Sequence, residues 1–308
     1  MNLQVDYLRK QESAQSVAEV TAIPLSRVQE RVDETAHRFG DGLIGVISHA
    51  VAGTAPQINA SRIGVVLLNA GLTRHVGPYR AYAELARRLA REGYPVLRFD
   101  QSGLGDSALP EQAAAGHRSR EIDAAMSLLA EHAGAERFVL CGLCSGADDA
   151  FHVAAADHRV AGAILLDGLA YPTQGFWLRH ALPRLLSPTK VIAYLRSRRN
   201  AGPSLADFRD FPAKADAARM LSDMVARDTR LLFVFTGGAY TYFNHPSQLA
   251  GCLGRAPRSP QVGLEYWREY DHTFYLRKHR EMLFARISHW MATMWGQPAG
   301  SSREIAST

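Results

Sequence analysis

Cysteine is scarce in this chain, with three residues among 308. A small, odd number in a long chain does not make a disulfide framework and favours the reducing cytoplasm. Cys141 and Cys144 have the Cys-x-x-Cys spacing, but neither a second ligand pair nor a thioredoxin-like context accompanies them. We therefore expect no metal site and no redox dithiol, and we expect Cys141 to pack in a β-sheet.

The chain also lacks a long apolar run. Segments such as GAILLDGLA and GVVLLNAGL are interrupted by Asp or Asn, and they fall well short of the roughly 20 residues that a membrane span needs. The start, MNLQVDYLRKQESAQ, has no apolar segment after a basic one, so we expect no secretion signal. The formal net charge is only +5, with scattered Lys and Arg and no aromatic-basic array, so we do not expect nucleic-acid binding.

A dinucleotide-binding loop is missing as well. Such a loop has the pattern G-x-G-x-x-G opening a helix directly after a strand, with an acidic residue about 20 positions further on. The glycine-containing stretch FDQSGLGDS does not meet these conditions and is better explained as a turn that belongs to the fold. The sequence therefore predicts no nucleotide cofactor.

Short apolar, β-branched runs alternate with amphipathic helical stretches along most of the chain. This alternation, with 47% apolar residues, predicts one large α/β domain in which helices flank a mostly parallel sheet. The expected strands are 42–51, 63–71, 94–100, 137–142, 160–168, 230–238 and 263–267. The expected helices are 79–93, 118–133, 246–253 and 277–295.

Three segments fall outside this alternation. Residues 1–36 are polar and helix-like and predict an N-terminal helical extension, and the composition of residues 297–308 predicts a flexible tail. Residues 171–227 contain helix-like pieces broken by five prolines, which predicts a helical cap inserted over one end of the sheet. The α/β core is then formed by residues 37–170 and 228–296.

The stretch Gly142-Leu143-Cys144-Ser145-Gly146 lies between an expected strand and an expected helix. Glycines two residues before and after a central residue are typical of the strand-to-helix elbow that presents a nucleophile in G-x-S-x-G enzymes. Only glycine leaves room for the close approach of strand and helix, and the helix N-terminus favours a thiolate. The alternatives are a buried structural thiol and a fold of this type without catalysis.

Three blocks carry a resemblance to a known superfamily: LLNAGLTRHVGPYRAYAELARRLAREGYPVLRFDQSGLGDS, GLCSGADDA and YDHTFYLRKHREMLFARISHWM. Over residues 40–295 the sequence resembles the α/β-hydrolases, in particular small bacterial hydrolases with a Gly-x-Cys-x-Gly elbow, including exosortase-associated ones. The resemblance implies an acyl-transfer enzyme with nucleophile, acid and histidine in that chain order.

The resemblance also implies roles for individual residues. Cys144 takes the place of the nucleophile, and His272, between the last strand and the last helix, takes the place of the base. The amides of Ser145 and Leu72 are the implied oxyanion hole, since they follow the nucleophile and the Asn-Ala-Gly at the end of an earlier strand.

The acid departs from the superfamily's usual pattern, because the loop TGGAYTYFN after the strand LLFVF contains no carboxylate. Asp167, at the end of the preceding strand, occupies a position that some superfamily members use, so it is our candidate. A loop-capping role for Asp167 remains the alternative. We expect Asp148 and Asp149 to be structural and Asp271 to shape its loop.

These residues predict an acyl-cysteine intermediate, with an acyl thioester as the preferred substrate. An ester or lactone hydrolase, an acyltransferase and a non-catalytic binding protein remain alternatives. From residue 171 to 206 the chain has six Lys or Arg and no acidic residue, interleaved with large apolar residues. This composition fits a coenzyme A or acyl-carrier thioester, although a solvated basic helix face fits it too.

Overall fold

The computed structural model describes residues 32–51, 62–109, 116–185, 209 and 211–296. Residues 1–31 and 297–308, predicted as part of an extension and as a tail, lie outside the described residues. So do residues 186–208 of the predicted cap, which include Arg196, Arg198 and Arg199.

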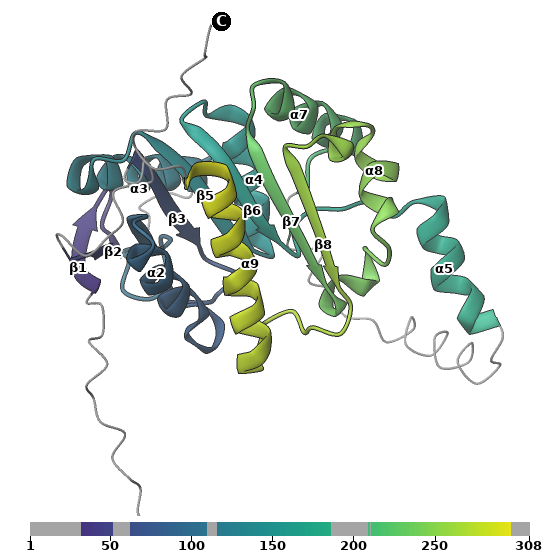
Figure 1. Ribbon diagram of the computed structural model, residues 1–308, viewed down its shortest axis with the longest axis horizontal. Coiled ribbons are helices and arrows are strands. Elements are labelled where there is room, and N and C mark those ends of the chain that lie inside the picture. The colour runs from purple at the N-terminus through teal and green to yellow at the C-terminus, as the bar shows by residue number, and fades with distance from the viewer. Residues whose placement is uncertain (1–31, 52–61, 110–115, 186–208, 210, 297–308) are drawn as a thin grey trace, which may run out of the picture. The chain divides into compact units, whose positions relative to one another are not determined.

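Eight strands form one sheet (Figure 1). They are β1 (Val32–Phe39), β2 (Leu43–Ala50), β3 (Ile63–Leu68), β4 (Val96–Asp100), β5 (Arg137–Leu143), β6 (Val160–Leu166), β7 (Arg230–Thr236) and β8 (Val262–Trp267). The α-helices are α2 (Ala81–Arg91), α3 (His117–Ala133), α4 (Ser145–Ala156), α5 (Gln174–Leu185), α7 (Lys214–Ala226), α8 (Ser247–Leu253) and α9 (Arg277–Trp295). Short 3-10 helices are η2 (Pro78–Arg80), η4 (Gly237–Thr241) and η5 (Ala256–Arg258).

The strands are ordered β1-β2-β4-β3-β5-β6-β7-β8 across the sheet. The six strands from β4 to β8 pair in parallel, whereas β2 pairs antiparallel with both β1 and β4. Because β3, β5, β6, β7 and β8 are parallel, their carboxyl ends meet at one edge of the sheet, where ligands bind in open α/β folds. The prediction of a mostly parallel sheet flanked by helices is confirmed.

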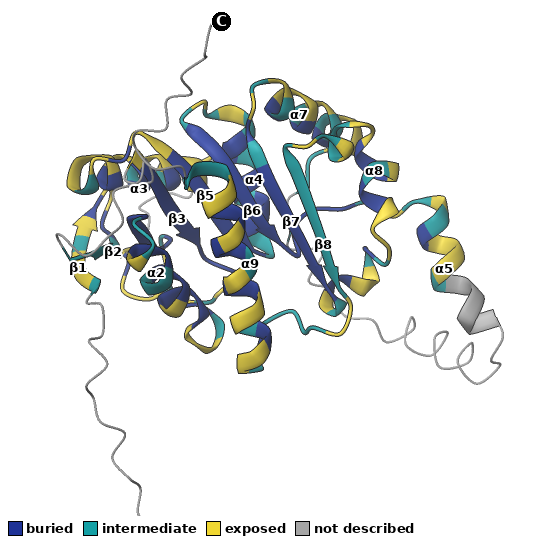
Figure 2. Ribbon diagram, in the orientation of Figure 1, coloured by how far each residue is buried: buried dark blue, intermediate teal, exposed yellow. Residues whose placement is uncertain are grey.

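Alternate side chains of the central strands pack into two separate apolar cores. In β3, Val66 and Leu68 face the core that α3, α4, α7 and α8 complete, whereas Val65 and Leu67 face the core that α2 and α9 complete. Figure 2 shows the central strands buried between these two helical layers. Burial on both faces explains why these strands read as continuous apolar runs in the sequence.

Two parts of the predicted domain organisation differ from the structure. Residues 32–36, assigned to the helical extension, belong to β1. This edge strand keeps most of its side chains in solvent, so its charged sequence lacks the apolar signal of a strand. Helix α7, assigned to the cap, buries Ala217, Leu221 and Met224 in the main core. Their spacing of four and three residues places them on one helix face, and α7 is therefore a helix of the core layer.

Within the described ranges, no helix combines the length and the apolar content that crossing a membrane requires.

Candidate active site

The turn between β5 and α4 presents Cys144 at the carboxyl edge of the sheet. Its backbone has φ 56° and ψ −119°, a region that residues other than glycine rarely adopt. A Cβ on Gly142 would lie 2.2 Å from the carbonyl of Gly146, and a Cβ on Gly146 would lie 2.4 Å from the carbonyl oxygen of Asn69. The two glycines are therefore required for the elbow to pack against itself and against the end of β3.

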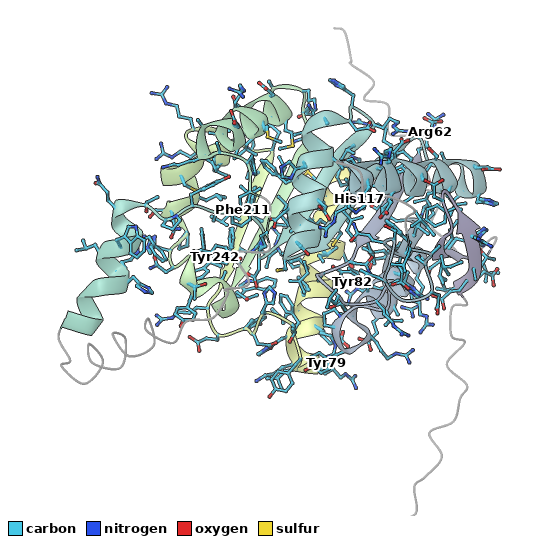
Figure 3. All side chains as sticks on the ribbon, turned by 180° about the vertical axis from the view of Figure 1, so that it is seen from behind. Arg62, Tyr79, Tyr82, His117, Phe211 and Tyr242 are labelled. Atoms are coloured by element: carbon cyan, nitrogen blue, oxygen red, sulfur yellow. The ribbon has the colours of Figure 1, made fainter. Side chains whose placement is uncertain are left out.

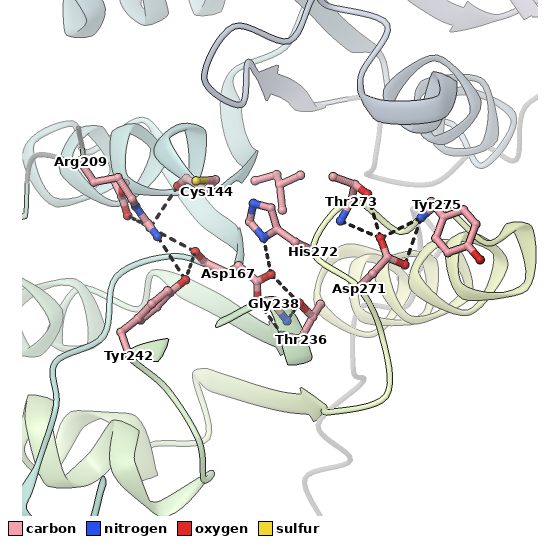
Figure 4. Close-up of polar contacts among 12 residues, drawn as sticks. Cys144, Asp167, Arg209, Thr236, Gly238, Tyr242, Asp271, His272, Thr273 and Tyr275 are labelled. Carbon is pink, nitrogen blue, oxygen red and sulfur yellow. Dashed lines mark hydrogen bonds and ion pairs between the residues drawn. The ribbon is translucent and has the colours of Figure 1, made fainter. Parts of the chain in front are cut away.

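Two loops bring His272 and Asp167 together beside Cys144 (Figure 4). Asp167 directly follows β6, and His272 lies between β8 and α9. The Nδ1 of His272 lies 2.7 Å from Oδ2 of Asp167, whose side chain is fully buried. The ring of His272 also lies close enough to the Cys144 thiol to lower the thiol pKa, and Nε2 is the ring nitrogen that Asp167 does not engage. The three candidate residues thus lie together at the sheet edge.

The loop after β7 lacks a carboxylate, but it holds Asp167 and His272 in place. The backbone N–H and the hydroxyl of Thr236 both donate to the Asp167 carboxylate at 2.6 Å. A Cβ on the next-but-one residue, Gly238, would lie 2.5 Å from the Cβ of His272. The Thr-Gly-Gly sequence therefore holds the acid from one side and leaves room for the histidine loop on the other.

Asp271 shapes its own loop, as predicted. Its carboxylate accepts hydrogen bonds from the backbone and hydroxyl of Thr273 and from the backbone of Tyr275 (Figure 4). Those contacts point its oxygens along the loop that leads to α9, whereas His272 faces the sheet edge. In the described part of the chain, the carboxylate bonded to the His272 ring is that of Asp167.

The three cysteines differ in their chemical environment. Burial raises the pKa of Cys141 to about 12 and also raises that of Cys252. Burial acts in the same direction on Cys144, but there the hydrogen bond from His272 and the nearby charge of Arg209 outweigh it and lower the thiol pKa. Since the thiolate is the reactive form, Cys144 is the thiol suited to nucleophilic attack.

The pKa of the His272 imidazole is shifted in the opposite direction from that of the Cys144 thiol. Burial disfavours its charged form, but hydrogen bonds to Asp167 and Cys144 overcome this effect and raise its pKa to about 9. A thiol whose pKa is lowered next to an imidazole whose pKa is raised favours the thiolate-imidazolium pair. This ion pair is the arrangement that activates a cysteine nucleophile.

The candidate oxyanion hole lies between the elbow and the loop after β3. The backbone amide of Ser145 contributes to lowering the pKa of Cys144. The hydroxyl of Ser145 accepts a hydrogen bond from the backbone N–H of Gly71 at 2.8 Å. Leu72, the residue implied by the superfamily pattern, has an exposed side chain. The amide bonded to the elbow in this structure is that of Gly71, one position earlier, and residue patterns alone do not distinguish these neighbours.

The FDQSGLGDS turn is hydrogen-bonded to the loop after β3. Asp100 at its start is fully buried and accepts hydrogen bonds from the backbone of His75 at 2.6 Å and from Asn69 at 3.4 Å. The His75 ring pairs with it at 2.8 Å. A Cβ on Gly105 would collide with the Asp100 carboxylate, which explains that glycine. This turn is structural, as its sequence indicates.

One charged residue of this region was missed by the sequence analysis. The guanidinium of Arg209 lies between Cys144 and Asp167 (Figure 4). It pairs with Asp148 at 2.6 Å. It stacks on Phe211 at 4.6 Å and on Tyr242 at 5.4 Å. Both residues are labelled in the view from behind (Figure 3). No spacing rule separates this arginine from the other basic residues of its segment.

Metal-binding residues do not gather in the described part of the chain: no group of three or more His, Cys, Asp or Glu is placed to hold an ion.

A mostly parallel sheet between two helical layers, with an elbow after a central strand and a histidine before the last helix, defines an α/β-hydrolase. The sequence matches the family described as serine aminopeptidase, S33, over residues 60–229, more than half of the chain. The chain therefore belongs to this family of hydrolases. No curated protein matches the sequence significantly.

Solved structures with the same fold include three enzymes or enzyme domains. An esterase of Pyrococcus furiosus is 13% identical with a TM-score of 0.55, over 86% of this chain and 91% of the esterase. The thioesterase domain from the curacin biosynthetic pathway is 15% identical with a TM-score of 0.52, over 85% and 99%. A serine hydrolase without a lid from Xanthomonas campestris is 14% identical with a TM-score of 0.50, over 86% and 96%. At these identities the likeness establishes the fold.

Proposed function

We propose that this hydrolase transfers acyl groups through an acyl-cysteine intermediate on Cys144, and that its substrate is an acyl thioester. The observation that carries the proposal is the grouping of Cys144, His272 and Asp167, in which the His272 ring lies beside the thiol and is bonded to Asp167 at 2.7 Å. The lowered pKa of Cys144 and the raised pKa of His272 support it, because together they favour the thiolate-imidazolium pair.

The reaction has two halves. In the first, the thiolate of Cys144 attacks the acyl carbonyl, and the imidazolium of His272 gives its proton to the departing thiol or alcohol. In the second, neutral His272 takes a proton from water, which attacks the acyl-cysteine and releases the acid and the thiolate. Asp167 holds the Nδ1–H of His272 at 2.7 Å, so that Nε2 serves both proton transfers.

Each tetrahedral intermediate carries a negative oxygen, and backbone amides are the donors available to it. The Ser145 amide follows the nucleophile at the N-terminus of α4, where the helix dipole also favours negative charge. The second donor comes from the loop after β3, for which Leu72 was predicted from the superfamily pattern and Gly71 is the amide in contact with the elbow.

A thioester is favoured over an ester because exchange of an acyl group between two sulfurs is close to isoenergetic. Hydrolysis of an ester or lactone uses the same residues and is the alternative, as is transfer of the acyl group to an alcohol or amine. A binding protein without catalysis is the remaining alternative, and the pKa pattern of the three thiols argues against it, since binding alone requires no activated thiol.

The carrier of the acyl group is proposed from the sequence of the cap. Arg196, Arg198 and Arg199 belong to a segment without acidic residues, and they lie outside the described residues. If they bind the phosphates of coenzyme A or an acidic carrier, activity on such a thioester falls in high salt and in the triple Ala variant. A short neutral thioester of the same acyl group is the control, and an equal response of both substrates contradicts the carrier proposal.

Three free thiols, none of them paired in the described residues, support a reducing location such as the cytoplasm.

Trapping of the acyl-enzyme tests the proposal directly. After brief incubation with an acyl thioester, intact-mass measurement is expected to show the parent protein carrying one acyl group and Cys144→Ala carrying none. Turnover is expected to disappear in the same variant. Cys141→Ala and Cys252→Ala are matched controls, because both thiols are buried and have raised pKa values. Acylation or turnover that persists in Cys144→Ala removes the acyl-cysteine mechanism.

A further inference from the structure

Arg209 forms hydrogen bonds with the candidate site in addition to its ion pair with Asp148. Its side chain is 5% exposed, and its guanidinium donates to both carboxylate oxygens of Asp148 at 2.6 and 2.7 Å. It also donates to the hydroxyl of Tyr242 at 3.1 Å. The remaining donations go to the backbone carbonyls of Asp167, at 3.1 Å, and of Cys144, at 3.4 Å.

Those two carbonyls belong to the proposed nucleophile and the proposed acid. Both residues have positive φ, 56° for Cys144 and 47° for Asp167, although neither is a glycine. Such backbone conformations persist only where the surroundings hold them. The guanidinium bonds both carbonyls while its other nitrogens bond Asp148 and Tyr242, so it fixes these strained turns relative to each other and to their surroundings. A lysine has one nitrogen and cannot make the whole set of bonds, and an apolar residue can make none of them.

The charge of Arg209 has a second consequence. Other ionisable groups that face Cys144 are His272, with Asp167 behind it, and two tyrosines, Tyr82 beneath the elbow and Tyr242 beside Arg209. Arg209 and His272 are the positive groups among them. Asp148 pairs with the guanidinium and neutralises part of its charge. Burial raises the Asp148 pKa to about 6 despite that ion pair.

We propose that Arg209 is a positioning residue of this site: it holds the backbone carbonyls of Cys144 and Asp167 together, and its charge favours the thiolate of Cys144. The inference rests on the proposed function, since it assigns Arg209 a role in preparing that nucleophile. Arg209 contacts neither the reacting atoms nor the His272 ring, so it acts through the two residues whose carbonyls it binds.

The test uses thiol alkylation, which needs no substrate. The rate of Cys144 alkylation by iodoacetamide is measured against pH by peptide mass spectrometry in the parent and in Arg209→Met/Asp148→Leu. The double variant removes both charges, so that no unpaired carboxylate is left buried. We expect alkylation at neutral pH to fall about tenfold, with the whole profile moving to higher pH because less thiolate is present.

Arg227 provides a matched control, because it also binds backbone carbonyls of the protein core. Arg227 also donates to two backbone carbonyls of α4, those of Ala154 and Ala155, but at the far end of the helix from Cys144. Arg227→Met removes an arginine clamp without touching the site, and it is expected to leave the alkylation profile unchanged. Thermal unfolding of each variant separates a loss of folding from a change in the thiol.

Arg209→Lys separates charge from geometry, and it keeps the geometric role testable if the double variant does not fold. It keeps a positive charge, but its single nitrogen cannot bond the two carbonyls, both oxygens of Asp148 and the Tyr242 hydroxyl together. We expect near-parent alkylation and a kcat reduced roughly tenfold with little change in KM, because misplaced reacting groups raise the barrier without weakening substrate binding. Parent-like kcat in Arg209→Lys removes the geometric role, and an unshifted alkylation profile in the folded double variant removes the electrostatic one.

Failure of this inference and failure of the proposed function give different results. If Cys144→Ala keeps its turnover, the proposed function fails, whatever Arg209 does to alkylation. If Cys144→Ala is inactive while the Arg209 variants match the parent in both alkylation and kcat, the function stands and the positioning role of Arg209 is wrong.

Discussion

The imidazole Nδ1 of His272 lies 2.7 Å from Oδ2 of Asp167, although the two residues are 105 positions apart. The same carboxyl group accepts two hydrogen bonds from Thr236, so each of its oxygens has a protein donor. A fully buried carboxylate satisfied in this way has one orientation, and it fixes the orientation of the imidazole in turn.

Asp167→Asn is expected to lower kcat/KM roughly 100-fold. A loss of this size is within the contribution that a correctly oriented general acid-base makes to the rate. The carboxylate accepts on both oxygens, whereas the amide has one acceptor oxygen and an NH2 group, so either the backbone N–H of Thr236 or the Nδ1–H of His272 with the Thr236 hydroxyl loses its acceptor. Asp271→Asn is the matched control next to the same histidine, and we expect less than about a threefold change because that side chain bonds its own loop. Steady-state kinetics on folded variants measure both, and the reverse order would reassign the partner of His272.

The elbow and the histidine could be predicted from the sequence because each has a local signature. Gly142 and Gly146 mark a turn that only glycine permits, and His272 stands between a strand and a helix of clear periodicity. Asp167 was only one of several carboxylates. Its selection depends on a contact between two loops, and such a contact has no pattern in the chain.

Features that depend on tertiary packing were missed for the same reason. Arg209 is one arginine in a basic segment, and its burial becomes visible only when Asp148 and the two carbonyls surround it. Strand β1 carries a polar sequence because it forms an edge, and α7 follows a proline-rich stretch that suggested an insertion. In each case the neighbours in space decide the structure, and local propensity does not.

The rate of acylation is expected to follow a bell-shaped pH profile. The reactive thiolate-imidazolium pair forms as pH rises through the lowered Cys144 pKa, and it is lost as pH rises through the His272 pKa of about 9. Thus kcat/KM, which reports the free enzyme, should rise, level off and then fall above about pH 9. Initial rates across overlapping buffers measure this profile. A rate that keeps rising well past that point indicates that His272 acts only as a neutral base.

The His272 pKa provides a control for that profile. The hydrogen bond and the charge of Cys144 are among the causes that raise it. In Cys144→Ala these causes are removed while Asp167 remains, so the His272 pKa measured by NMR is expected to fall below its parent value. An unchanged pKa would show that the ring does not bond the thiol in solution.

Gly146→Ala is expected to destabilise the fold by about 3 kcal/mol or more, since the clash is with backbone that cannot move aside. The added Cβ would lie 2.4 Å from the carbonyl oxygen of Asn69 and 2.7 Å from that of Leu68. Gly134→Ala is the control: Gly134 has φ +65° but no atom within 4 Å of an added Cβ, so only the backbone strain of about 1 kcal/mol remains. Urea unfolding compares the two, and equal losses would mean that the elbow relaxes to admit a side chain.

The contact between Ser145 and Gly71 leads to the last prediction. Gly71 has φ +53° and open space around it, so its loop is not held by packing at that point. The hydroxyl of Ser145, which accepts the Gly71 N–H at 2.8 Å, keeps this amide beside the elbow. Losing one such hydrogen bond costs about 1 kcal/mol, so we expect Ser145→Ala to lower activity roughly fivefold.

The loss in Ser145→Ala should fall on kcat and spare KM, because the amide is needed most when the oxyanion forms in the transition state. Ser145→Thr retains the hydroxyl and is expected to stay within about twofold of the parent, since the hydrogen bond to Gly71 survives. Steady-state kinetics on one acyl substrate distinguish the cases. If Ser145→Ala is faster than the parent, the hydroxyl occupies a donor that the substrate oxygen needs, and Ser145 then blocks the oxyanion hole in the free enzyme instead of supporting it.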